Sequence, residues 1–355
     1  MSGPYSDKIL LLSFILVPFG LLSFGSVHQG HYIAFIVAAL LVAAFDVKEK
    51  PLSWFMLYIA AWSVYRHFVY VFSGDPFAIK PEISKVAMLA FICGYVIYSK
   101  VKESKLSNEW FYNCICMFAL IQAVLGIGQA FGYNPALDFL MSKTNTKSLM
   151  GNREISGMLG NQDFLAAVFA ISLPFFFRKY WALGLILIIP LLAYMKVSTA
   201  VITALVVIVV YFSKNYKQGA MIGIACLVAS AVYLWRVENL TMNNERFLMW
   251  SKALEQFETW PQIIFGFGPG SKWGGRGALH NDWLSVFHTF GIVGLSFVGA
   301  YVFQTIKNIM ENRRILAAIV AVCVDAFGSL PMQLAPSVFL IIILFGLAQR
   351  EVVYG

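Results

Sequence analysis

Residues 110–131 of the chain read WFYNCICMFALIQAVLGIGQAF, a run without a single charged side chain. A helix needs about 20 predominantly apolar residues to cross the hydrocarbon core of a bilayer, so this run is long enough for one span. The whole chain has the same character, because 59% of its 355 residues are apolar and only 12% are charged. A soluble domain carries about 25% charged residues. We therefore predict a single all-α integral membrane domain over residues 1–355.

Further apolar runs lie on both sides of this one. Counting runs of about 17 residues or more predicts about twelve spans, near residues 8–27, 31–47, 52–73, 83–99, 110–131, 161–177, 181–196, 198–213, 219–235, 283–306, 315–330 and 334–349. The first run has no small-residue cleavage site after it, so we interpret it as an uncleaved first span.

Basic residues in the short connections predict the orientation of these spans. Cytoplasmic loops carry an excess of lysine and arginine. With twelve spans, the basic connections all lie on one side, which we take as the cytoplasm together with both termini. Their basic residues are Lys48, Lys50, Lys100, Lys102, Lys105, Arg178, Lys179, Lys214, Lys217, Lys307, Arg313, Arg314 and Arg350.

Two long polar segments, residues 132–160 and 236–282, then face outward. Both are basic, and an anionic ligand is the simplest reason for basic external loops. In the second segment, apolar residues at 247, 250, 254 and 257 share one helix face. This pattern predicts an interfacial helix near residues 244–258. Arg246 falls in its first turn, where free backbone N–H groups favour anions.

Composition excludes some kinds of site. The net charge is +8, but the basic residues are scattered between apolar runs, so we predict no nucleic-acid partner. The five cysteines all fall in apolar runs, and we interpret them as core side chains rather than disulfides or metal ligands. No histidine pair has the spacing of a zinc site with carboxylate support, so we predict no catalytic metal and no cofactor.

Polar residues at or inside the spans are candidates for function. His280 stands just before a span, and an imidazole suits proton transfer near neutral pH, although a lone histidine is more often structural. Charge inside a span marks a pathway or a buried pair. Arg66, His67 and His288 lie there, and an ion pair between Arg66 and Asp325 is one reading.

Glycines are dense in the second polar segment, at positions 266, 268, 270, 274, 275 and 277. Glycine admits tight backbone turns and close backbone approach. Two interpretations remain open at this point: backbone amides that approach a phosphate, or a flexible surface segment.

Motifs in the second half of the chain resemble the O-antigen ligase and O-antigen polymerase superfamily of polytopic membrane glycosyltransferases. His280-Asn281, followed after nine residues by Gly291-x-x-Gly294, resembles the signature of the ligases at the outer membrane face. Residues 153–161, an arginine, spaced glycines and Asn161, are similar to the family's pattern that opens a span.

A third motif is Arg246-x-x-x-Trp250, followed by Pro261 and Gly266-x-Gly268. The resemblance covers roughly residues 150–350, and the first 150 residues resemble the family only in hydropathy. The chain departs from the family at Ser198-Thr199, where members often carry Ser-Arg, and at residues 161–163, where Asn-Gln-Asp replaces a frequent Pro-Asn.

The resemblance implies a GT-C-like, metal-independent glycosyltransferase of the bacterial inner membrane, with its active site facing the periplasm. The donor would be a glycan linked to undecaprenyl pyrophosphate. A ligase transfers it to the lipid A core in lipopolysaccharide biosynthesis, and a polymerase transfers it to a lipid-linked repeat unit. We expect the ligase first. Transfer to a protein serine or threonine ranks last, because that branch usually carries a soluble C-terminal part and this chain ends at Gly355.

The predicted site follows from the chemistry of that donor. A departing pyrophosphate gains negative charge, and arginine binds phosphate oxygens in bidentate fashion. We predict Arg153 and Arg246 in this role, with His280 as the base that activates an acceptor hydroxyl in an inverting displacement. Further substrate-binding candidates are Lys272, Arg276, Asn161, Asn281 and Asp282. The alternative from another class is a transporter or flippase for the same lipid-linked glycan, which the charges inside the spans would support.

Overall fold

A computed structural model of the chain describes residues 94–95, 97–133, 155, 159, 162–195, 197–213, 243–268, 279, 281–328 and 335–354. Helices account for 84% of the residues that can be interpreted, and none of these residues lies in a strand. The prediction of an all-α protein is confirmed for this part of the chain.

Helices occupy the predicted spans that the structure describes. They are α5 (Asn108–Ala130), α7 (Gln162–Lys179), α8 (Trp181–Leu183) with the π-helix η2 (Gly184–Ile188) and α9 (Ile189–Met195), α10 (Ser198–Phe212), α14 (Asp282–Asn308), α15 (Arg313–Asp325) and α16 (Ala335–Tyr354). Among them, α5 and α14 are long and apolar enough to cross a membrane. Four predicted spans, near 8–27, 31–47, 52–73 and 219–235, and most of 83–99 lie outside the described residues, so the count of twelve stays a prediction.

Helix α5 begins and ends where its sequence provides caps. The Ser107 side chain accepts a hydrogen bond from the Trp110 N–H at 3.2 Å, as N-cap serines do. At the other end Gly132 adopts a positive φ of 83°, and the Tyr133 N–H then donates to the Gly128 carbonyl at 2.8 Å. A left-handed glycine after the last turn is a common way for a helix to stop.

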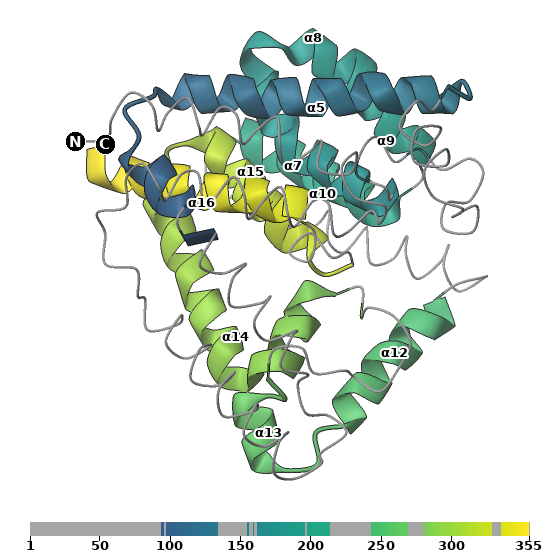
Figure 1. Cartoon of the computed structure of the whole chain (residues 1–355), viewed down its shortest axis with the longest axis vertical. Coiled ribbons are helices and arrows are strands. Elements are labelled where there is room, and N and C mark those ends of the chain that lie inside the picture. The colour runs from purple at the N-terminus through teal and green to yellow at the C-terminus, as the bar shows by residue number, and fades with distance from the viewer. Residues whose placement is uncertain are drawn as a thin grey trace, which may run out of the picture.

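Helix α7 is the centre of the helical bundle. Every residue from Leu165 to Phe176 is buried, and α7 packs against α5, α10 and α15 (Figure 1). A helix that is apolar all round is either enclosed by other helices or covered by lipid, and α7 is enclosed. The apolar residues that predicted a span at 161–177 are therefore the ones that the other helices enclose.

The outer faces of the two longest helices are also apolar. On α5 the side chain of Val124 is 61% exposed, and Met117 and Ile121 lie on the same face. On α14 Phe303 is 70% exposed, and Phe297 is exposed as well. Extended apolar surface of this kind marks a membrane or protein contact. Together with the length of these helices, it supports a membrane protein.

The helix ends gather at two opposite ends of the bundle. At one end, where α5 and α15 begin and α7 ends, the Glu109 carboxylate pairs with Arg178 at 3.2 Å and with Arg314 at 2.8 Å. Close by, the Arg350 guanidinium donates to the Leu106 carbonyl at 2.7 Å. We call this the arginine end. The starts of α7, α10 and α14 lie at the other end, which we call the Asn281 end.

Two helices lie in the polar segment 236–282. Helix α12 (Asn243–Glu255) overlaps the helix predicted near 244–258, starting one residue earlier and ending three residues earlier, while its position at a membrane surface stays a prediction. Helix α13 (Trp260–Phe265) was not predicted. It starts with a capping box between Thr259 and Gln262 and has Pro261 in its first turn. In Figure 1 α12 and α13 lie beside α14, away from α5.

Candidate functional site

A side-chain hydrogen bond and a close backbone approach join the helices at the Asn281 end. The Gln162 amide, one residue after Asn161, donates to the carbonyl of Met195 at the end of α9. Gly328, just after α15, lies so close to Thr199 at the start of α10 that a β-carbon there would collide with the threonine side chain. The starts of α7 and α10 and the end of α15 therefore form one layer of this end.

The start of α14 binds to the end of α15. The Asp282 N–H donates to the Ala326 carbonyl at 2.8 Å, and the Trp283 indole donates to the Cys323 carbonyl at 2.9 Å. Asn281 is the N-cap of α14, because its side-chain oxygen accepts from the Leu284 N–H at 2.9 Å. These bonds fix the backbone that follows His280.

Helix α12 docks against the residue that precedes His280. The Trp250 indole donates to the Leu279 carbonyl at 2.7 Å. Ala253 and Leu279 are both buried in a small apolar cluster with Trp250. The docking therefore fixes α12 against the residue that precedes His280 in the sequence. Position 246 is one helical turn before Trp250, and residues four apart lie on the same helix face.

The two glycine motifs cross each other. Helix α14 is broken at Gly291, whose φ is 65° and ψ is −164°. Just before the break, the carbonyls of His288 and Thr289 accept from the N–H groups of Phe267 at 2.9 Å and Gly268 at 2.7 Å. A β-carbon on Gly266 would lie 2.5 Å from the α14 backbone at the break. Only glycine at this crossing lets the two backbones come this close.

At two of its positions, the crossing supports neither interpretation of the glycine-rich segment. The amides of Phe267 and Gly268 bind α14 and are not directed at a ligand. Gly266 and Gly268 are also held in fixed, positive-φ conformations. The phosphate-amide expectation is therefore wrong at these two amides, and the segment from 266 to 268 is a structural clasp on α14. Glycines 270, 274, 275 and 277 lie outside the described residues.

His288 belongs to the same clasp. Its side chain is 3% exposed, and its ring stacks on Phe267 with a centroid distance of 4.6 Å. The ring of Phe257 meets it edge-on, and His288 Nε2 lies 2.9 Å from Gln256 Oε1. These contacts give His288 a packing role between α12, the clasp and α14. Asp325 is buried at the end of α15, and its predicted partner Arg66 lies outside the described residues.

The structure describes only part of the predicted site. Asn281 caps α14, and Asp282 is 2% exposed in the first turn; their predicted contact with substrate is not tested. Arg246 lies on α12. The residues that lie outside the described part of the chain are Arg153, Asn161, Lys272, Arg276 and His280.

Sequence reasoning missed two features that hold this region together. The first is the pairing of Gly266 with Gly291, which no pattern within either motif reveals. The second is Gln256, the hydrogen-bond partner of His288. In the described residues, no group of three or more histidine, cysteine, aspartate or glutamate side chains is arranged to hold a metal ion.

Comparison with known proteins does not identify the chain. No protein-family model matches it, and no curated protein matches it significantly.

Proposed function

We propose that this protein is a membrane glycosyltransferase that moves a glycan from undecaprenyl pyrophosphate to a sugar hydroxyl, most simply as an O-antigen ligase. One observation carries the proposal. Segments of two motifs that resemble that superfamily are in direct contact: Trp250 binds Leu279, the residue before His280, and Gly266–Gly268 clasps α14 at Gly291. Motifs far apart in a sequence that meet in space are expected of one site.

The residue that follows the 153–161 motif, Gln162, lies at the same end of the bundle. Asn161 immediately precedes Gln162, whose side chain binds Met195 beside the start of α10. The start of α10 approaches the end of α15, to which α14 is bound through Asp282. This chain of contacts supports the convergence of Arg153, Arg246 and His280 on one site.

The proposed reaction is a single displacement. The acceptor hydroxyl oxygen bonds to the anomeric carbon of the donor sugar, while the bond from that carbon to the pyrophosphate oxygen breaks. The hydroxyl proton passes to the imidazole of His280, and undecaprenyl pyrophosphate leaves between Arg153 and Arg246. Because base and leaving group act on opposite faces of the sugar, the anomeric configuration inverts.

The proposed cations and the proposed base differ in how they contribute to the reaction rate. A cation that is fixed against developing negative charge contributes about 3–4 kcal/mol in favourable cases, by analogy with oxyanion donors. A positioned general base contributes about 10²–10⁴-fold in rate. Loss of His280 should therefore slow the chemical step. Loss of Arg153 or Arg246 should weaken both donor binding and the stabilisation of the leaving group. Lys272 or Arg276 is proposed as a third cation at the same phosphates.

The direct experiment is glycan transfer by the purified protein in detergent. The protein is mixed with an undecaprenyl-pyrophosphate-linked glycan and a lipid A-core acceptor, and products are separated by gel electrophoresis and mass spectrometry. A new glycosidic bond to the acceptor supports the proposal. A transporter or flippase cannot make such a bond, so donor that stays intact with both acceptors, lipid A-core and lipid-linked repeat unit, would refute the enzyme.

The same experiment separates the ligase from its polymerase alternative. Lipid-linked repeat units alone give a ladder of longer products only if the enzyme joins donor to donor. A single product that requires the lipid A core identifies the ligase.

A further inference from the structure

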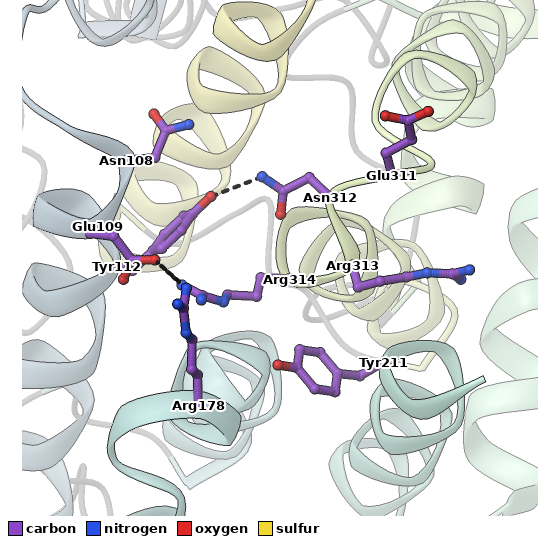
Figure 2. Close-up of a pocket in the computed structure, with 9 residues that line it drawn as sticks. All are labelled: Asn108, Glu109, Tyr112, Arg178, Tyr211, Glu311, Asn312, Arg313 and Arg314. Carbon is purple, nitrogen blue, oxygen red and sulfur yellow. Dashed lines mark hydrogen bonds and ion pairs between the residues drawn. The ribbon is translucent and has the colours of Figure 1, made fainter. Parts of the chain in front are cut away.

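A pocket of about 490 Å³ opens at the arginine end, where α5 and α15 begin and α7 and α10 end (Figure 2). Three arginines line it, Arg178, Arg313 and Arg314, against two carboxylates, Glu109 and Glu311. The pocket is at the opposite end of the bundle from the contacts around Asn281. It is therefore separate from the proposed glycosyl-transfer site.

Arg314 forms one wall of the pocket and is held in place by its neighbours. The Arg314 side chain is only 13% exposed. Its guanidinium carbon lies 4.9 Å from the centroid of the Tyr112 ring, and it pairs with Glu109 at 2.8 Å. The Asn312 amide donates to the Tyr112 hydroxyl at 3.0 Å. A desolvated arginine held from two sides keeps its charge at a fixed point. A phosphate that displaces the half-exposed Glu109 carboxylate therefore meets a guanidinium that is already in place.

The other two arginines of the pocket are held less firmly than Arg314. Arg178 is 71% exposed and reaches Glu109 at 3.2 Å, an exposed pair of the kind that contributes about 0–1 kcal/mol. Exchanging that carboxylate for a phosphate therefore costs little. Arg313 makes no ion pair within the described residues, and Figure 2 shows it directed away from Glu109. Arginine grips phosphate oxygens in bidentate fashion.

The surroundings favour a lipid over a soluble anion. Phe177, Tyr211 and Phe212 form an aromatic cluster with centroid distances of 4.8–5.1 Å. Tyr211 lines the pocket, while Phe212 is largely exposed at the end of α10. Aromatic rings at helix ends are typical of membrane–water interfaces, and basic pockets between spans on the cytoplasmic side bind lipid headgroups.

We propose that this pocket binds the phosphate headgroup of an anionic phospholipid, of the phosphatidylglycerol class. The headgroup phosphate lies against Arg314, Arg178 closes over it, and the acyl chains pass along the exposed ring of Phe212. The proposal depends on the chain spanning a membrane and does not depend on glycan transfer.

The test is a lipid titration of the purified full chain in a non-ionic detergent. Dioctanoyl phosphatidylglycerol or dioctanoyl phosphatidylcholine is added, and bound lipid is counted by native mass spectrometry. The test variant is Arg178→Gln with Arg313→Gln. The control is Lys179→Gln with Lys307→Gln, which removes the same charge from residues that do not line the pocket.

An arginine near an anionic headgroup is worth roughly fivefold in affinity, so the test variant should bind phosphatidylglycerol roughly 25-fold more weakly. The control variant should bind like the wild type, and phosphatidylcholine should bind weakly throughout. Equal losses in both double variants would overturn the proposal in favour of diffuse attraction. Displacement of the lipid by millimolar inorganic phosphate would overturn the lipid as the ligand. If the double variant does not fold, Arg313→Gln alone, which breaks no ion pair in the described part, should weaken phosphatidylglycerol binding roughly fivefold.

Discussion

Replacing Gly291 with alanine should destabilise the protein, because the break in α14 requires glycine. Its φ of 65° with ψ of −164° belongs to a region that is essentially restricted to glycine, and holding another residue there costs about 1–3 kcal/mol. The new β-carbon would also lie 2.6 Å from the backbone nitrogen of Gly266. Pushing the clasp away removes two backbone hydrogen bonds, worth about 1 kcal/mol each. The expected loss is about 3–5 kcal/mol.

The matched control lies in the same helix. Gly299 has no atom within 4 Å of the position that a β-carbon would take. Gly299→Ala should therefore leave the protein unchanged or more stable by about 0.5–1 kcal/mol, the usual gain inside a helix. Thermal unfolding of both variants in the same detergent, followed by intrinsic fluorescence, gives the comparison. Equal melting temperatures for Gly291→Ala and Gly299→Ala would refute the clasp.

Substitutions at three further positions test other contacts of the fold. Trp250→Phe removes the hydrogen bond to Leu279 and should lower stability by about 1 kcal/mol and slow glycan transfer; unchanged transfer would contradict the role of α12 docking. Asn281→Ala should lose about 1 kcal/mol of helix capping, whereas Asn281→Asp should keep the cap, as thermal unfolding will show. Arg314→Lys, which gives up the stacking on Tyr112 and the hydrogen bond from Nη1 to Glu109, should lower the melting temperature more than Lys307→Arg does.

The sequence predicted the helices better than it predicted how they meet. The apolar runs at 161–177 and 198–213 became α7 and α10, because length and hydropathy are local properties. The break at Gly291 could not be predicted, since the apolar pattern of α14 continues through it. A glycine at one position does not reveal that it will face another glycine 25 positions away, so the clasp could not be predicted from either motif.

At the candidate site, too, single helices were easier to predict than the contacts between them. A helix carrying Arg246 was predicted from the spacing of its apolar residues, and α12 lies there. Helix α13 was missed although Thr259 and Gln262 have the spacing of a capping box, because the glycines that follow favoured a loop. His288 was weighed as a pathway residue, but its stacking on Phe267 and its bond to Gln256 depend on residues from two other segments.

Transfer by His280→Ala tests the central claim most directly. With the undecaprenyl-pyrophosphate-linked glycan as donor, the single-turnover rate of transfer should fall by about 10²–10⁴-fold. The dissociation constant for the donor, measured separately, should stay within about twofold of the wild-type value. Lys252→Ala, an exposed change on α12, should transfer at the wild-type rate. Wild-type turnover by His280→Ala would contradict the assignment of the base and the site built around it.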